Sequence, residues 1–196
     1  SPYLRRRLVL EQDAVATAVL EHGAEGAEKF IQEVIWRGYF KGWMERRPVV
    51  WDQYREGMTR DLMALDRDRG LRRRVESAEA YQTGLDYFDN WAEELVETGY
   101  LHNHARMWFA SIWIFTLRLP WELGAAFFYE HLLDGDVASN TLSWRWVAGL
   151  QTPGKTYVAR ADNIAHYTDG RHVPQASHLA SAAFPITEPA LPKFAG

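Results

Sequence analysis

Residues 134–146 read DGDVASNTLSWRW, and the rest of the chain is organised around this stretch. An Asp-Gly-Asp turn opens it, and on a helix Asp136, Asn140 and Trp144 recur at i, i+4 and i+8, so they share one face. Such a stripe is unusual for a core face, because buried Asp and Asn need hydrogen-bond partners, which a flat polar ligand would supply. The spacing alone favours a plainer interpretation: a helix capped by Asp, with an exposed Asn and core tryptophans.

The composition limits the classes of protein to consider. A chain of 196 residues fits one domain and can bury a sizeable core. Cysteine is absent, which excludes disulfides, thiolate zinc sites, Cys-ligated iron–sulfur clusters and Cys nucleophiles. Nine Trp, nine Tyr and nine Phe suggest stacking or electron transfer, although a core filled with large side chains explains most of them.

The charge and hydropathy bear on contact with nucleic acid and membranes and on the cellular compartment. A net charge of −4 argues against non-specific coating of nucleic acid, but it leaves room for a local basic patch. No apolar run approaches the length of about 18 residues that a membrane span needs, and no secretory signal is evident. We therefore expect a cytoplasmic protein without a membrane partner. Because the chain starts at Ser1 rather than Met, we expect a fragment or a trimmed chain.

Hydrophobic spacing and stop residues predict a series of helices, and strand-like alternation is scarce. The expected helices cover residues 12–22 (stopped by Gly23), 24–47, 60–80 with a break at Gly70, 85–97, 108–118, a helix with Pro120 in its first turn, and 162–167. Residues 49–57 are expected as a loop or a short turn of helix. From residue 174 onward, Pro, Ser and Ala predict an extended tail, wrapped on the body or loosely ordered. The predicted fold class is all-α.

The motif D-G-D-x-A-x-N-x-x-x-W-x-W resembles the flavin-binding signature of the DNA photolyase and cryptochrome family. Three further segments match the family in order: E-x-x-W-R at residues 33–37, T-G-x-x-x-x-D at 83–89, and GYLHNHARM at 99–107. The resemblance covers about residues 1–163 and only the family's C-terminal helical half, since the α/β antenna domain has no counterpart here. It implies a multi-helix FAD-binding domain over residues 1–173, followed by a tail over 174–196.

The resemblance also implies which residues hold the cofactor, FAD. By this resemblance, Arg106 pairs with Asp134 beside the flavin, Asn140 lies near flavin N5, and Asp136 faces the flavin ring system. Ser1 matches the tail of a phosphate-binding segment whose upstream Thr and Ser are missing. The implied cofactor residues are Ser1, Phe30, Arg37, Asn103, Arg106, Asp134, Asp136 and Asn140.

A second set of residues is implied for the substrate, a pyrimidine dimer in damaged DNA. These are Glu33, Trp36, Asn103, Met107 and Trp146. In the family, the branch that repairs (6-4) lesions has His at the positions of Asn103 and Met107. Asn with Met resembles the branch that splits cyclobutane dimers.

Electron transfer to the flavin is implied for Trp144 and Trp121, the first and second members of the family's tryptophan chain. The third should fall near Asp68, within a stretch that contains no aromatic residue. Another tryptophan could take the place of this third member, and the sequence does not show which: Trp43, Trp51, Trp91, Trp108 or Trp113. No metal site is predicted, because His102 and His104 at i and i+2 do not face each other on a helix.

These features predict a photolyase-like enzyme that uses FAD and blue light to repair cyclobutane pyrimidine dimers. Trp144, Trp121 and Asn140 are its expected catalytic residues. The alternative is a cryptochrome-like flavin photoreceptor without repair activity, favoured by the acidic net charge and the missing third tryptophan. A third hypothesis is a flavin-free scaffold that keeps the fold. Nothing in the sequence indicates an oligomeric state.

Overall fold

The computed structural model describes residues 1–152 and 154–188, and over these residues the backbone contains helices and no strand. This confirms the predicted all-α fold class. None of the described helices combines the length and apolarity needed to cross a bilayer. In chain order the elements are α1 Pro2–Arg5, α2 Glu11–Gly26, α3 Glu28–Glu45, α4 Pro48–Arg67, α5 Arg69–Glu79, α6 Asp86–Thr98, α7 Asn103–Ser111, the π-helical turn η1 Ile112–Thr116, α8 Trp121–His131, α9 Val137–Val147, α10 Ala161–Tyr167 and the 3₁₀ turn η2 Ala176–His178.

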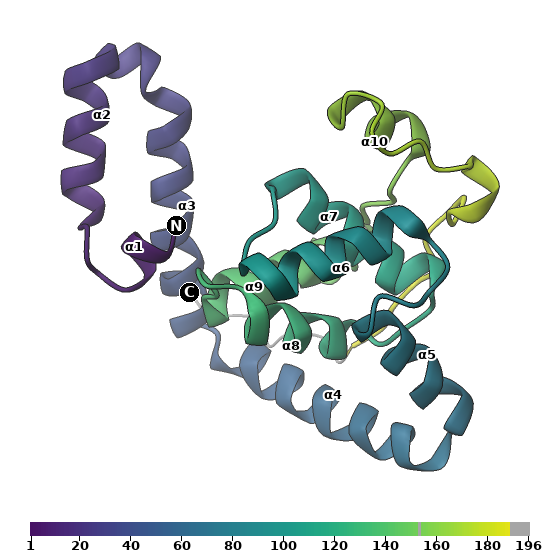
Figure 1. Ribbon diagram of the computed structural model, residues 1–196. Coiled ribbons are helices and arrows are strands. Elements are labelled where there is room, and N and C mark those ends of the chain that lie inside the picture. The colour runs from purple at the N-terminus through teal and green to yellow at the C-terminus, as the bar shows by residue number, and fades with distance from the viewer. Residues whose placement is uncertain (153, 189–196) are drawn as a thin grey trace.

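Helices α6 to α9 form the body of the molecule, α4 and α5 run along one side, and the α2–α3 hairpin projects from it (Figure 1). The sequence pattern explains how α6 joins the core. Phe88, Ala92 and Leu95 lie at i, i+4 and i+7 on one face, and all three are fully buried. Gly99 then ends α6 in the left-handed conformation, with a φ of 67°.

Aromatic side chains fill this core. The Phe88 and Phe109 rings stack with centroids 4.2 Å apart, and the Trp144 ring meets the Phe128 ring edge-on at 5.1 Å. The high aromatic content therefore mostly reflects core packing, the plainer of the two explanations. Five of the nine tryptophans are buried: Trp91, Trp108, Trp113, Trp121 and Trp144.

The prediction of a loop or a short turn of helix over residues 49–57 is wrong, because these residues lie within the 20-residue helix α4. Pro48 occupies the first turn of this helix, where its missing N–H has no partner to lose and its fixed φ suits the helix. Val50 and Gly57 are buried against the body. A single valine and a glycine form too weak an apolar pattern to reveal this face in the sequence.

Two predicted helix ends are also wrong. Gly23 does not stop the first helix but kinks it with a φ of 71°, and the helix runs on to Gly26. The break expected at Gly70 falls two residues earlier, at Asp68. Its carboxylate accepts hydrogen bonds from the backbone N–H of Gly70 at 2.8 Å and of Leu71 at 3.0 Å, so Asp68 caps α5.

The segment predicted as one buried helix over residues 108–118 is divided between α7, which begins at Asn103, and η1. Pro120 precedes α8 instead of occupying its first turn. The short helix expected over residues 162–167 is present as α10.

Residues 174–188 cross the body as an extended strap, one of the two alternatives for the tail. The backbone N–H of Ala180 donates to Thr116 Oγ1 at 3.0 Å, and Leu179 is buried. Arg145, only 2% exposed, forms an ion pair with Glu188. The rest of the predicted tail, residues 189–196, lies outside the described residues, as does Pro153.

A pair of buried carboxyl groups joins α4 to α8. Glu122 and Asp61 lie against each other, and the Glu122 carboxyl group fills the space beside Gly57, where a Cβ would approach Oε1 to 2.2 Å. Burial, together with the charge of Asp61, raises the pKa of Glu122 to about 8, although Arg60 at 3.4 Å acts in the opposite direction. Burial also raises the pKa of Asp61.

This pair predicts a stability that falls as the pH rises. Between about pH 4.5 and pH 8 the unfolded chain releases the Glu122 proton while the folded chain retains it, so each rise in pH favours unfolding. We expect a Glu122→Gln variant to be more stable than the parent at pH 8, by on the order of 2 kcal/mol. Thermal unfolding between pH 5 and pH 9 tests this, and parallel curves for parent and variant would contradict it.

Candidate functional site

A pocket of about 1010 Å³ lies between α1, α3, α7 and α9. It gathers residues from positions as far apart as Ser1 and Thr152. Every residue predicted to hold the cofactor or the substrate lines it, and Trp144 does so too. Trp121 does not. The predicted lining residues are Ser1, Phe30, Glu33, Trp36, Arg37, Asn103, Arg106, Met107, Asp134, Asp136, Asn140 and Trp146.

One wall of the pocket carries an ion pair between Arg106 and Asp134. Arg106 Nη2 lies 3.2 Å from Oδ1 and 3.3 Å from Oδ2 of Asp134, and Arg106 Nε donates to the Leu101 carbonyl at 2.8 Å. Burial alone would raise the pKa of Asp134. The Arg106 guanidinium and the terminal amine of Ser1, 3.2 Å away, instead hold that pKa below its usual value. Asp134 is therefore ionised at neutral pH.

A second carboxylate, Asp136, marks the start of α9 and attracts cations from two other helices. Its side chain accepts a hydrogen bond from the Ser139 N–H at 3.1 Å, with Lys41 Nζ at 3.5 Å and Arg5 Nε at 3.9 Å. Burial acts to raise the pKa of Asp136, but Ser139, Lys41 and Arg37 lower it. The cations of α1 and α3 are thus held at the pocket by an acid that caps α9.

Asn140 and Trp144 continue the stripe along α9. Asn140 Nδ2 donates to the Ala125 carbonyl at 2.7 Å, which fixes the carboxamide against α8. Trp144 is 2% exposed and packs over Gly124, where a Cβ would approach its Cη2 to 2.4 Å. The plainer interpretation of this stripe is therefore right about the Asp cap and about Trp144, but Trp146, its second expected core tryptophan, is 41% exposed. The same interpretation is wrong about Asn140, which is hydrogen-bonded and partly buried.

The pocket's rim is aromatic. Trp36 is 50% exposed and Trp146 is 41% exposed, although both line the pocket. The rings of Tyr39 and Phe40 lie 5.2 and 5.6 Å from the Trp36 ring. Sequence reasoning missed the lining residues Tyr39, Phe40 and Trp43. Their spacing of three, four and seven residues from Trp36 on one helix could have found them.

The two tryptophans predicted to transfer electrons differ in their position relative to the pocket. Trp144 lines the pocket, whereas Trp121 on α8 is buried and does not line it. Asp68, where the family has its third tryptophan, is the cap of α5. Among the candidate replacements, Trp51 reaches Trp121 through Tyr54, with ring centroids 5.1 Å and then 5.6 Å apart. The role of these residues in electron transfer stays a prediction.

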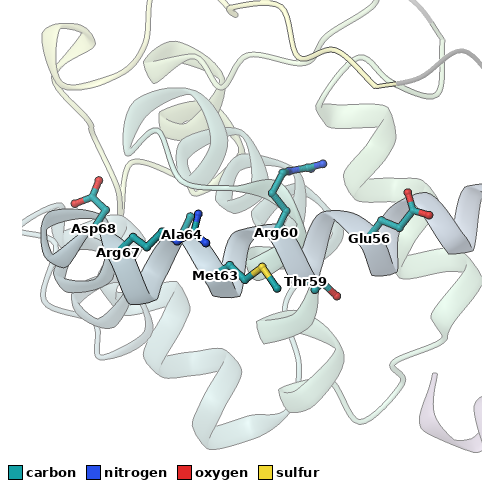
Figure 2. A pocket seen from close by; sticks show the side chains of 7 residues that line it. All are labelled: Glu56, Thr59, Arg60, Met63, Ala64, Arg67 and Asp68. Atoms are coloured by element: carbon teal, nitrogen blue, oxygen red, sulfur yellow. The ribbon is translucent and has the colours of Figure 1, made fainter.

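A different hollow of about 580 Å³ lies along α4 (Figure 2). All seven of its lining side chains come from this one helix and from Asp68 at its end, so no second element closes it. None of the predicted site residues lines it. It is an open helix face rather than a convergent site.

The chemistry of the large pocket fits a flavin dinucleotide. Its volume reaches the upper end of the range of about 300–1000 Å³ typical of small-molecule sites. Aromatic side chains offer surface to a planar ring, and the fixed Asn140 amide offers polar contact. The guanidinium groups of Arg37 and Arg106 can donate hydrogen bonds to a diphosphate, and each also pairs with a carboxylate, Glu11 at 3.3 Å and Asp134 at 3.2 Å. Fold and site together define a helical domain that binds a flat aromatic ligand with anionic groups.

Comparison with known proteins makes this class specific. Residues 30–176 match the family described as the FAD binding domain of DNA photolyase. The chain therefore belongs to this family, and its cofactor is FAD. How each lining residue contacts the cofactor stays a prediction.

Individual relatives agree with this assignment. The chain is 32% identical over 202 residues to a deoxyribodipyrimidine photo-lyase of Streptomyces griseus, covering 96% of this chain and 41% of the relative. It is 32% identical over 163 residues to that of Thermus thermophilus, covering 80% and 36%. It is 35% identical over 119 residues to a cryptochrome DASH of Natronomonas pharaonis, covering 60% and 24%. The chain thus spans about two fifths or less of the length of these relatives.

Proposed function

We propose that this domain uses FAD and blue light to repair cyclobutane pyrimidine dimers in DNA. One observation carries the proposal: the pocket combines a fixed ion pair and a fixed amide, which suit FAD, with the exposed indoles of Trp36 and Trp146 at its rim. The names of the Streptomyces and Thermus relatives, both deoxyribodipyrimidine photo-lyases, support the same activity.

Inside the pocket, the chain's own residues would bind and orient the cofactor. The Arg106–Asp134 pair holds two opposite charges at fixed positions, and Arg37 presents a cation. The bond from Asn140 to Ala125 keeps the amide from rotating away. FAD, when bound and reduced, supplies the light-excited electron that opens the cyclobutane ring. Trp144 and Trp121 would carry electrons inward to the cofactor.

At the rim, the residues would receive the lesion. A dimer must leave the duplex before its reacting bonds become accessible, which costs a few kcal/mol and less for a damaged pair. Trp36 and Trp146 would then stack on the extruded bases, while Glu33, Asn103 and Met107 would contact their edges. The Asn103 Nδ2 atom lies 3.9 Å from the Met107 sulfur, so these two side chains lie together on one side of the opening.

We expect a Trp146→Ala variant to bind dimer-containing DNA about tenfold more weakly, because a base–indole stack contributes about 1–3 kcal/mol. The ring is 41% exposed, so removing it leaves little unfilled core. Fluorescence anisotropy in the dark with a dimer-bearing oligonucleotide measures the loss. Trp146→Phe is the matched control and should retain most of the affinity. Equal affinity for parent and Trp146→Ala would exclude this stacking role.

The main alternative is a cryptochrome-like photoreceptor without repair activity. The relation to a cryptochrome DASH and the net charge of −4 favour it. Repair requires preference for damaged over undamaged DNA of the same sequence, whereas equal and weak binding to both favours signalling. For the flavin-free scaffold, a protein that remains colourless after incubation with FAD would be the supporting result.

A further inference from the structure

A second hollow adjoins the rim of the FAD pocket. It measures about 440 Å³, and residues between Tyr157 and Tyr167, including α10, line it. The Tyr157 ring stacks on the Trp146 ring with centroids 5.7 Å apart and an interplanar angle of 25°. Because Trp146 lines the FAD pocket, this pair of stacked rings forms the divide between the two hollows.

Tyr167 also lines the second hollow, and two histidine rings pack against its ring. Its centroid lies 4.2 Å from that of His104, with an interplanar angle of 23°, while His166 meets it edge-on at 4.8 Å. His104 follows Asn103, which lines the FAD pocket. Tyr167 nevertheless remains 53% exposed. Packing therefore fixes its orientation and leaves aromatic surface for a ligand to cover.

The electrostatics of the second hollow are nearly balanced. Arg160 and Asp162 form a two-bond ion pair at 2.8 and 3.0 Å, and both side chains are exposed. An exposed pair of this kind contributes little, so the Arg160 guanidinium can turn to a phosphate at small cost. Stacking rather than charge would hold a ligand here, which agrees with the acidic net charge of the chain.

We propose that the second hollow binds the nucleotide next to the lesion, with its base against Tyr167 and its phosphate near Arg160. This rests on the proposed function, because a strand that places a dimer in the FAD pocket must leave across its rim. Aromatic surfaces that accept any base are the usual platform for single-stranded DNA, and one exchangeable cation meets the backbone. The second hollow would therefore bind the part of the strand that lies next to the dimer.

Binding in the dark separates this proposal from repair itself. The FAD-loaded protein is titrated by calorimetry with a thymine dimer dinucleotide, and with the same dimer extended by one nucleotide on the 5′ or the 3′ side. We expect one of the two extensions to tighten binding about tenfold, the gain from one stacked base. An extension by one abasic nucleotide, which has the sugar and phosphate but no base, should increase the affinity by much less than the complete nucleotide does.

Variants of Tyr167 then locate the added base. Tyr167→Ala should abolish the gain from the extension and leave the affinity for the bare dinucleotide unchanged, while Tyr167→Phe should keep both. No gain on either side, or a gain that persists in Tyr167→Ala, would overturn the proposal even though the bare dimer binds. A bare dimer that fails to bind would instead refute the proposed function, and the assignment of this hollow with it.

Discussion

An Asp134→Ala variant is expected to bind FAD about 100-fold more weakly than the parent. Asp134 is ionised and largely buried, and its partner Arg106 borders the same pocket. Removing the carboxylate takes away the partner that fixes the Arg106 guanidinium at the pocket wall, and a 100-fold loss corresponds to about 2.7 kcal/mol of binding free energy. Arg106 would also be free to swing away from the position that the pair fixes.

The measurement is a titration of apo-protein with FAD, followed by flavin fluorescence. Asp66→Ala is the matched control, because Asp66 pairs with Arg72, both side chains are exposed, and neither residue lines the pocket. It should leave FAD affinity unchanged. Circular dichroism confirms that each variant is folded. If Asp134→Ala bound FAD as tightly as the parent, the ion pair would not belong to the cofactor site.

The second large effect is expected from Glu188 in the C-terminal strap. Arg145 is almost completely buried, its guanidinium pairs with Glu188, and its Nε has no hydrogen-bond partner among the described residues. The Trp121 ring lies 5.9 Å from its Cζ. Glu188→Ala leaves this charge buried and unpaired, and we expect the free energy of unfolding to fall by about 3–5 kcal/mol. For a chain of this length, that lowers the Tm by roughly 10 °C.

A double variant distinguishes the loss of the Arg145–Glu188 ion pair from the loss of the strap's packing on the body. Arg145→Met combined with Glu188→Leu removes both charges and keeps similar volume, so it should recover most of the stability. Urea unfolding of the parent, both single variants and the double variant gives the coupling energy. If Glu188→Ala unfolded within about 0.5 kcal/mol of the parent, the range for surface changes, the strap would contribute nothing through this pair.

The sequence predicted many of the residues that line the pocket, but it missed Tyr39, Phe40 and Trp43 and did not predict the hydrogen bonds inside the pocket. Arg106, Asp134 and Asn140 could be assigned to one site because the order and spacing of motifs resemble a known family. The acceptor of the Asn140 amide, Ala125, could not be predicted. A backbone carbonyl carries no sequence signal, and α8 and α9 meet only through tertiary packing.

The errors in the fold have a similar cause. Local pattern predicted α6 well, because its apolar residues recur at helical spacing around a strong core face. It failed at residues 49–57, where Val50 and Gly57 are the buried residues and the charged neighbours obscure them. The pairing of Arg145 with Glu188 joins positions 43 residues apart. Such a contact depends on the path of the strap, which no short-range rule describes.

The central claim is light-driven repair, and one measurement tests it most directly. The FAD-loaded protein is reduced, mixed with an oligonucleotide that carries a single thymine dimer, and illuminated with blue light while chromatography follows the lesion. The account predicts that the dimer disappears under illumination, that intact thymines replace it, and that a dark control shows no change. Persistence of the dimer, with flavin bound and reduced throughout, would contradict the account.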